Sequence, residues 1–322
     1  MHQCRICGAP GGECFDVREM MYGTRERFAY FACSLCRCLQ IAEVPSDLSA
    51  YYPRNYYSLS MSRESGRVKR AIRSRRLKAL LGEGGHFWRW VNLRSRHQPA
   101  WLWWARMARI SVDSRILDVG SGAGRLLVNM SNWGFRRLTG VEPHIEADIA
   151  YPGGVRVLKR PIEDVEGVFD FIMFHHSFEH IAEPLSALRG ACRLLTPGGR
   201  ALIRIPVADG EVWQTYGADW VQLDAPRHLF LHTRNSIQIL TDQAGLELDD
   251  VVFDSTGFQF WGSELYRRDI PLLDGGTGKA LRLELVFSGK DLREFEAKAR
   301  ELNEHGRGDQ ACFFLRKPEA TS

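Results

Sequence analysis

Short apolar runs alternate with stretches of helical spacing between residues 115 and 245. Five runs are almost continuously apolar, which is typical of strands buried on both faces: RILDVG, RLTGVE, GVRVL, FDFIMF and RALIRIP. Between some of these runs, apolar residues recur at helical spacing and end at Gly134, Pro197 and Gly245, and Thr233 is a candidate N-cap. Strands that alternate with helices predict a parallel sheet covered on both faces.

Two later apolar runs break this alternation. They are LELDDVVF at 246–253 and ACFFLRKP at 311–318, and an insertion at 262–309 with a charged stretch of helical spacing separates them. We expect them to pair as a hairpin-like edge, which brings the sheet to seven strands. The predicted fold class is therefore α/β, with a Rossmann-like, doubly wound, mostly parallel seven-stranded sheet.

The chain changes character twice before this sheet begins. Residues 1–45 hold six of the eight cysteines, and residues 46–110 open with the Tyr-rich YYPRNYYS and continue as a basic, Trp-rich stretch. We predict three parts from these changes: a small cysteine-rich domain at 1–45, a linker with a basic helical cap at 46–110, and the α/β domain at 111–322. The insertion at 262–309 is a candidate lid or dimer element, so an oligomer is possible.

The composition is that of a globular protein with a substantial core, because 44% of the 322 residues are hydrophobic and the net charge is only +4. No apolar run approaches the roughly 20 residues of a membrane helix. The N-terminus lacks the apolar stretch of a secretory signal. We therefore expect a cytoplasmic protein with no transmembrane segment, whose cysteines are thiols or metal ligands.

A glycine loop follows the first strand predicted for the sheet. In ILDVGSGAG, the glycines at 120, 122 and 124 alternate, and Asp118 precedes them. Such a loop lets a cofactor approach the backbone at a helix N-terminus. Its G-x-G-x-G spacing departs from the dinucleotide fingerprint G-x-G-x-x-G. At the tip of the second strand, Glu142 offers a carboxylate to ribose hydroxyls, a role shared by NAD proteins and S-adenosylmethionine (SAM) proteins.

Four motifs together decide between these cofactors: Asp-x-Gly-x-Gly-x-Gly, GVEP, FDFIMFHHSFEHIAEP and LLTPGGRALIRIP. Their succession resembles the class I SAM-dependent methyltransferases over about residues 114–254. The resemblance implies SAM as cofactor and a cofactor site made of Asp118, Gly120, Gly122, Gly124, Glu142, Glu163 and His175. Many relatives hold adenine with an Asp just after the third strand, but this chain has Pro161 near that place, which leaves the acids at 163 and 164 as candidates.

Two C-x-x-C pairs predict a metal site near the N-terminus. The pairs are CRIC and CSLC, 25 residues apart, and they supply Cys4, Cys7, Cys33 and Cys36. Four thiolates form a closed tetrahedral Zn²⁺ site, which is structural rather than catalytic. We therefore predict a zinc ribbon at 1–45, in which the aromatic strand RFAYFAC belongs to a hairpin between the two pairs.

The ribbon, the YYPRNYYS linker and the segment APRHLFLHT together resemble bacterial methyltransferases that modify sugars, often nucleotide-linked sugars used for polysaccharides or natural products. This resemblance implies a small-molecule sugar acceptor and methyl transfer to one of its hydroxyls. Some members methylate a sugar carbon and carry a further large C-terminal domain. Carbon methylation is an alternative that the length of this chain disfavours.

The candidate catalytic residues lie in HHSFEH, directly after the fourth strand of the predicted sheet. In open α/β sheets, chemistry takes place beyond the carboxyl ends of the strands. A histidine is a suitable base for a hydroxyl proton, and a carboxylate can orient it. The resemblance to the sugar enzymes favours His180 as base with Glu179 as helper, and His176 is the second candidate base. The alternative is that Glu179 and His180 only cap the next helix.

Further candidates concern the acceptor. Arg227 and His228 follow the fifth strand of the predicted sheet, and an arginine there suits a diphosphate, although a structural ion pair is equally expected. Aromatic rings stack on sugar faces, so Tyr56 and Tyr57, together with the pair at 51–52, are candidate walls of the acceptor pocket, although packing between ribbon and core explains them equally well.

The basic stretch raises two other possibilities. Between residues 63 and 115, Arg and Lys greatly outnumber acids, and tryptophans are frequent. With a zinc ribbon this composition is also compatible with an RNA base methyltransferase. The mild net charge and the lack of an Asn/Asp-Pro-Pro-aromatic motif make nucleic acid the weaker candidate partner. We favour a helical cap whose tryptophans pack on the core. A non-catalytic SAM-binding scaffold is a further alternative, which the intact glycine loop disfavours.

Overall fold

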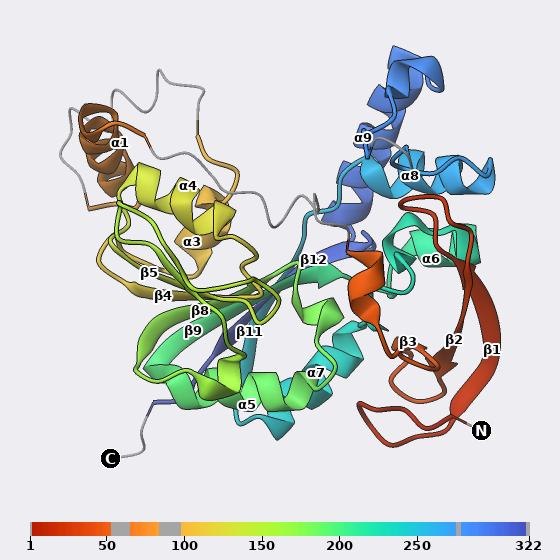
Figure 1. Ribbon diagram of the computed structural model, residues 1–322, viewed down its shortest axis with the longest axis horizontal. Coiled ribbons are helices and arrows are strands. Elements are labelled where there is room, and N and C mark those ends of the chain that lie inside the picture. The colour runs from red at the N-terminus through yellow and green to blue at the C-terminus, as the bar shows by residue number, and fades with distance from the viewer. Residues whose placement is uncertain (1, 53–64, 84–97, 275–277, 320–322) are drawn as a thin grey trace.

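A twisted sheet with helices on both faces forms the centre of the molecule (Figure 1). The computed structural model describes residues 2–52, 65–83, 98–274 and 278–319. The strands of this sheet, in spatial order, are β11 (Glu247–Phe253), β12 (Gln310–Arg316), β9 (Leu195–Pro206), β8 (Phe169–His175), β4 (Arg115–Val119), β5 (Arg137–Val141), β7 (Arg156–Leu158) and β6 (Ile149–Ala150).

The strand directions confirm the predicted fold class. The five strands β7, β5, β4, β8 and β9 pair in parallel, whereas β12 runs antiparallel to both of its neighbours, β9 and β11. The late pair is therefore the antiparallel edge that the sequence predicts, with the insertion between its strands. The sheet has one strand more than predicted because the two-residue β6 pairs with β7. A strand that short has no periodic signal in the sequence.

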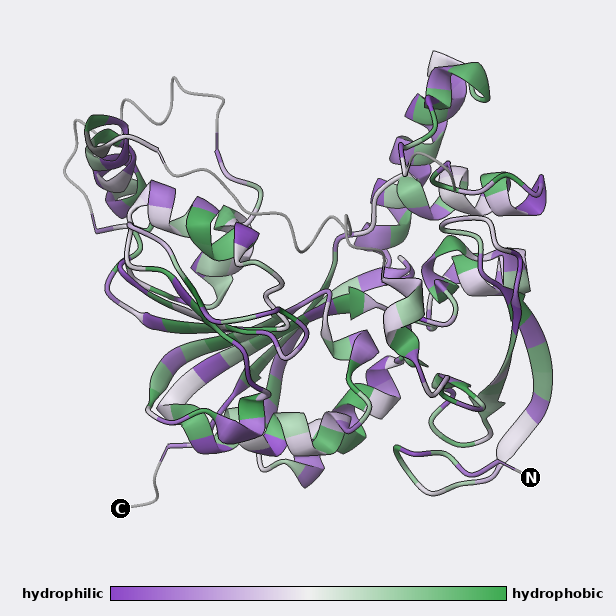
Figure 2. Cartoon of the chain, in the orientation of Figure 1, coloured by the Kyte–Doolittle hydropathy of each residue, from purple (hydrophilic) through white to green (hydrophobic). Residues whose placement is uncertain are grey.

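Helices cover both faces of the sheet. They are α1 (Arg67–Leu80), α3 (Leu102–Met107) and α4 (Arg125–Trp133) on one face, and α5 (Pro184–Leu194) and α7 (Arg234–Gln243) on the other (Figure 1). Strand β8 serves both faces, since its alternating residues enter two separate apolar cores: Phe171 and Met173 contact the first group of helices, and Ile172 and Phe174 the second. Figure 2 accordingly shows apolar strands between amphipathic helices.

The helix ends follow the local signals. Thr233 caps α7 through a reciprocal pair of hydrogen bonds with Ser236, and Gly134 and Gly245 stop α4 and α7 with positive φ. Helix α5 ends at Leu194, somewhat before Pro197, because Leu195 is already extended and begins β9.

A second, smaller sheet contains the N-terminal segment. Its order is β1 (Gly11–Arg18), β2 (Arg27–Cys33), β3 (Leu39–Ile41) and β10 (Phe230–Leu231). Strand β10 belongs to the α/β part of the sequence but pairs with β3, so the two parts share a sheet. The aromatic RFAYFAC forms β2, in a hairpin with β1. The division into three parts at 45 and 110 stays a prediction.

In the described residues, one helix runs into the insertion, a second lies within it, and a short helix packs beside the first. These are α8 (Phe258–Arg267) and α9 (Gly289–Glu304), with α6 (Glu211–Tyr216) beside them (Figure 1). The charged stretch is helix α9, whose start is fixed by reciprocal hydrogen bonds between Ser288 and Asp291. Helix α8 packs against α9 and α6, on the side of the molecule that carries β1.

The described part of the basic stretch packs on the core. Trp104 is buried and stacks on Phe171, and Trp101 donates its indole N–H to Asn129 Oδ1 over 2.8 Å. In α1, the guanidinium groups of Arg73 and Arg76 lie over the ring of Trp133. Among the described residues, no helix is both long and apolar enough to cross a membrane.

Candidate functional site

The glycine loop lies between β4 and α4, at the carboxyl edge of the sheet. Gly120, Gly122 and Gly124 all have positive φ, a backbone region that side chains disfavour. At two of these positions a Cβ would also clash, with Ser177 Cβ at Gly120 and with Val157 Cγ2, 2.7 Å away, at Gly124. The packing therefore requires glycine, and backbone N–H groups line the start of α4.

Two carboxylates flank this loop. Asp118 is buried, and burial, followed by the nearby charge of Glu142, raises its pKa well above the usual range. Within the described ranges, no ion pair joins Asp118 to a cation. Glu142 is half-buried and accepts hydrogen bonds from the N–H groups of Gly122 (3.2 Å) and His144 (3.1 Å). A cofactor with cationic groups and ribose hydroxyls fits this pair of carboxylates and the open backbone beside it.

The other two residues assigned to the cofactor lie apart from the loop in sequence. Glu163 is exposed on a single turn at 162–164 after β7, and its backbone carbonyl accepts a hydrogen bond from Arg193. His175 ends β8, where its ring lies near Trp104, and burial lowers its pKa well below the ordinary value. These positions do not test whether Glu163 and His175 bind the cofactor, so both assignments remain predictions.

The turn after β8 brings the catalytic candidates to the same edge. His176 adopts a left-handed backbone (φ 55°), which reverses the chain, and Ser177 Oγ donates to the carbonyl of Val119 over 2.5 Å. A single turn, η4 (Phe178–His180), follows. The end of β8 is thereby fixed against the end of β4, next to the glycine loop.

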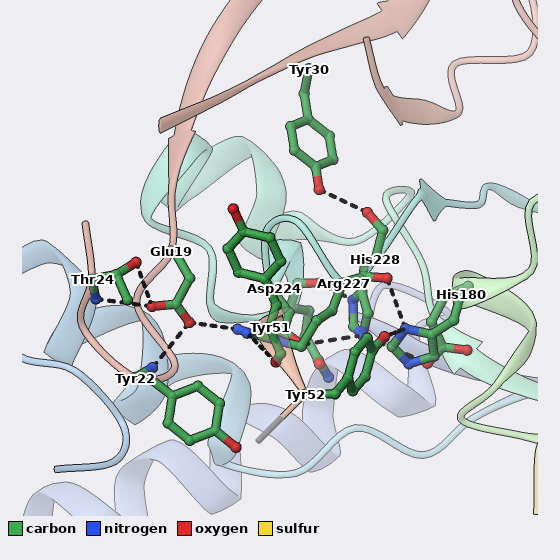
Figure 3. A network of polar contacts seen from close by, with 12 residues as sticks. Glu19, Tyr22, Thr24, Tyr30, Tyr51, Tyr52, His180, Asp224, Arg227 and His228 are labelled. Atoms are coloured by element: carbon green, nitrogen blue, oxygen red, sulfur yellow. Dashed lines mark hydrogen bonds and ion pairs between the residues drawn. The ribbon is translucent and has the colours of Figure 1, made fainter. Parts of the chain in front are cut away.

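Within the described ranges, the hydrogen bonds of the His180 ring involve Nδ1 and not Nε2. Its Nδ1 lies 2.8 Å from the carbonyl oxygen of Arg227, and a carbonyl only accepts, so Nδ1 carries the proton and Nε2 the lone pair. Tyr52 Oη lies 3.2 Å from the same Nδ1 (Figure 3). Burial lowers the pKa of His180 below its ordinary value, and His228 adds to this effect. The imidazole is therefore neutral and able to accept a proton at Nε2.

His176 is differently placed. Its Nε2 contacts Arg204 Nη1, and since a guanidinium only donates, the Nδ1 of His176 carries the proton. That Nδ1 lies 3.7 Å from Glu179 Oε1. Burial, followed by the charge of Arg204, lowers the pKa of His176 to about 3. Because Nε2 accepts from Arg204 and Nδ1 is protonated, His176 has no lone pair left and is less suited than His180 to take a proton from an acceptor.

His228 comes from a distant segment but joins the same cluster. Its Nδ1 lies 2.7 Å from the carbonyl of Gln222, and its ring centroid lies 4.7 Å from that of His180. Its Nε2 lies 3.9 Å from Glu179 Oε1. Glu179 is 1% exposed, and neither of its carboxylate oxygens has a hydrogen-bond partner in the described part of the chain.

Arg227 lies in a buried ion-pair network (Figure 3). It is 1% exposed, and its guanidinium contacts Glu19 (2.8 Å) and Asp224 (2.7 Å) and donates to the carbonyl of Tyr51 (3.3 Å). Glu19 in turn accepts hydrogen bonds from the backbone N–H groups of Tyr22 and Thr24. This geometry favours the structural ion pair over the diphosphate-binding role that the sequence leaves equally open.

The tyrosine candidates divide into two groups. Tyr51 packs edge-on against Phe28 of the ribbon, whereas Tyr52 stands beside His180. Tyr56 and Tyr57, the two residues assigned to the acceptor, lie outside the described residues.

The four cysteines converge at the turn that joins β2 to β3 in the small sheet. Cys4 Sγ lies 3.6 Å from Cys36 Sγ, Cys7 Sγ lies 3.4 Å from Cys33 Sγ, and all four sulfur atoms lie within 4.8 Å of one another. Tetrahedral zinc with Zn–S bonds of about 2.3 Å places sulfur atoms about 3.8 Å apart. Gln40 Nε2 donates to Cys4 Sγ over 2.9 Å. The donor set and its spacing thus fit a zinc ion.

Sequence reasoning did not include Arg204 in the site. It is held by Asp254 (2.7 Å) and contacts His176. A signal for Arg204 is present in the sequence, because it interrupts the apolar run of RALIRIP in a central strand. A charged side chain inside such a strand needs a buried partner. Asp224, which orients Arg227, has no comparable signal because it lies in a loop.

We expect Glu142→Ala to weaken binding of the demethylated cofactor, S-adenosylhomocysteine, because ribose hydroxyls lose a charged acceptor. A charge-assisted hydrogen bond contributes about 1.5–3 kcal/mol, so the dissociation constant measured by calorimetry should rise by about 10- to 150-fold. The exposed Glu146, in the same loop, provides the matched control Glu146→Ala, which should bind normally. Equal affinities of the two variants would remove Glu142 from the cofactor site.

Comparisons with known proteins identify the family of the chain. The family described as "Methyltransferase domain" matches residues 87–251. The ubiquinone biosynthesis O-methyltransferase of Pseudomonas aeruginosa (strain UCBPP-PA14) is 29% identical over 158 residues, which cover 43% of this chain and 66% of that protein. The tRNA U34 carboxymethyltransferase of Syntrophotalea carbinolica is 32% identical over 124 residues, or 34% of this chain and 38% of that protein.

Among solved structures, the YcgJ protein from Bacillus subtilis aligns with a TM-score of 0.43 and 17% identity, over 68% of this chain and 97% of that one. The family match covers more than half of the chain and includes the glycine loop, the second-strand carboxylate and the turn after β8. The chain therefore belongs to the methyltransferase-domain family, within the class I fold of SAM-dependent methyltransferases.

Proposed function

We propose that this protein transfers the methyl group of SAM to a hydroxyl oxygen of a small-molecule acceptor. The observation that carries the proposal is the position of His180, whose Nε2 is unprotonated and which lies in the turn after β8, the turn that Ser177 joins to the end of β4. The name of the Pseudomonas relative, an O-methyltransferase, supports oxygen as the methylated atom.

The acceptor that we propose is a sugar, either nucleotide-linked or a polysaccharide precursor. The cysteine pairs, the YYPRNYYS linker and APRHLFLHT support this class through their resemblance to sugar methyltransferases. The structure adds that Tyr52, from the linker, lies against His180. An aromatic residue beside the base suits the apolar face of a sugar ring.

Each residue then has a physical role. The glycine loop and Glu142 bind the cofactor, whose sulfonium supplies an activated methyl group. His180 Nε2 takes the proton of the acceptor hydroxyl as the oxygen is alkylated. The carbonyl of Arg227 fixes the tautomer of His180, and the buried charge of Glu179 stabilises the imidazolium that forms.

Incubation with isotope-labelled SAM and a panel of nucleotide sugars, followed by mass spectrometry and NMR of the products, tests the proposal. A methoxy signal on a sugar is the expected result. A methyl group on a ring carbon would show the alternative carbon transfer, and the absence of any labelled sugar would contradict the proposal.

RNA is the second candidate acceptor. Helix α1 is strongly basic and has no acidic residue, and one relative is named a tRNA U34 carboxymethyltransferase. An RNA pool incubated in parallel with the sugars should stay unlabelled if the proposed function is right, and label confined to RNA would replace it.

We also propose that Cys4, Cys7, Cys33 and Cys36 hold one structural zinc ion. Metal analysis should give about one zinc per chain with tetrahedral sulfur coordination, because the four thiolates leave no open position. Replacement of Cys4 and Cys33 together by serine should abolish the zinc. Replacement of the exposed Cys14 should leave it in place. Zinc retained by the double variant would show that other ligands bind it.

A further inference from the structure

Glu179 is a buried carboxylate that forms no ion pair with a lysine or arginine of the described residues. Both oxygens lack hydrogen-bond partners in the described part of the chain, although the side chain is only 1% exposed. Nδ1 of His176 lies 3.7 Å from Oε1, which is too far for a hydrogen bond. A buried charge without a partner is strongly unfavourable, so a partner that fills the site is expected.

Two imidazole rings lie beside this carboxylate, and Nε2 of His228 is 3.9 Å from Glu179 Oε1. His180 and His228 each donate Nδ1–H to a backbone carbonyl, at 2.8 Å and 2.7 Å, so in the neutral form of either ring Nε2 carries the lone pair. Histidine ligands of metals are oriented in the same manner, through a hydrogen bond from the other ring nitrogen to a carbonyl or carboxylate.

The three side chains lie close enough to share an ion. One ligand atom from each of Glu179, His180 and His228 falls within 4.8 Å of the other two. Bonds of about 2.0–2.2 Å separate neighbouring ligand atoms by roughly 3–3.5 Å, so the side chains need to draw together only slightly. The nearby Asp224 is already paired with Arg227, which leaves Glu179 as the carboxylate available to a cation.

We propose that Glu179, His180 and His228 bind a divalent transition-metal ion, such as Mn²⁺, whose open positions receive the acceptor oxygen. This proposal rests on the proposed function for the identity of the acceptor, but not for the binding of the ion. Imidazole with carboxylate suits Mn²⁺, Co²⁺ or Zn²⁺ rather than Ca²⁺ or Mg²⁺. A bound ion lowers the pKa of a coordinated hydroxyl, so in the metal-loaded protein the ion activates the acceptor and His180 holds the ion, whereas without the ion Nε2 of His180 is the base.

Titration of the zinc-loaded full chain with Mn²⁺, followed by electron paramagnetic resonance of free Mn²⁺, tests the site. We expect about one Mn²⁺ per chain, an affinity at least tenfold weaker in Glu179→Gln, and unchanged affinity in the control Glu183→Gln, which alters an exposed carboxylate nearby. His228→Gln, which also removes one ligand, repeats the test if Glu179→Gln does not fold. Calorimetry with S-adenosylhomocysteine verifies that each variant is folded.

Absence of Mn²⁺ binding to the wild type, or equal binding to Glu179→Gln, would overturn the metal site and leave the proposed methyl transfer with His180 as base. Conversely, Mn²⁺ binding without labelled sugar would contradict the proposed function while supporting the site. Chelation should lower turnover while the cysteine-bound zinc stays at about one per chain. Turnover that is unaffected when Mn²⁺ has been removed would contradict the role of the ion.

Discussion

His180→Ala should lower turnover by about 10²- to 10⁴-fold, which is the usual contribution of a positioned general base. The reason is that Nε2 of His180 holds an available lone pair at the site edge, and alanine offers no acceptor. Affinity for S-adenosylhomocysteine should change little, because the assigned cofactor contacts come from the glycine loop and Glu142. Steady-state kinetics with the sugar identified by labelling, together with calorimetry, measure both quantities.

The matched variant is His176→Ala. The ring of His176 is bound to Arg204 through Nε2 and faces Glu179 through Nδ1. Replacing it should therefore lower turnover less than replacing His180. The reverse order of the two effects would transfer the role of the base to His176. If neither variant slowed the reaction, the Glu-His turn would serve only to start the next helix.

Arg227→Met should lower the free energy of unfolding by about 3–5 kcal/mol, because it leaves the buried carboxylates of Glu19 and Asp224 without their cation. The network joins the N-terminal segment, through Glu19, to the loop that carries His228. Loss of the Arg227 guanidinium should therefore destabilise both the N-terminal segment and this loop. Urea denaturation followed by fluorescence measures the change, provided that the transition is two-state.

The control is Arg27→Met, which removes an exposed ion pair with Asp16 within the ribbon hairpin. A pair of this kind contributes about 0–1 kcal/mol. The comparison also tests the diphosphate-binding role. If Arg227→Met were as stable as the wild type but raised the KM for a nucleotide sugar selectively, Arg227 would bind the acceptor rather than hold the fold.

Sequence patterns predict a structural feature well where that feature depends on a single segment of the chain. The apolar runs predict the strands of the central sheet apart from the two-residue β6, and the glycine spacing predicts the loop before α4, because each depends on residues close in the chain. The two C-x-x-C pairs similarly predict a cluster that the structure brings together. The order of the strands follows from the resemblance to a known fold, which composition alone does not supply.

The sequence by itself determined the sheet, the glycine loop, the cysteine cluster and the presence of histidines at the edge where chemistry is expected. Only the tertiary structure decided which partners those groups meet. Glu19 pairs with Arg227 across most of the chain, β10 joins the ribbon sheet, and His228 comes to lie beside Glu179. The physical reason is that contacts between distant segments depend on packing of whole elements, and no periodicity within a segment records them. The same holds for the free nitrogen of His180, which is fixed by a backbone carbonyl 47 residues away.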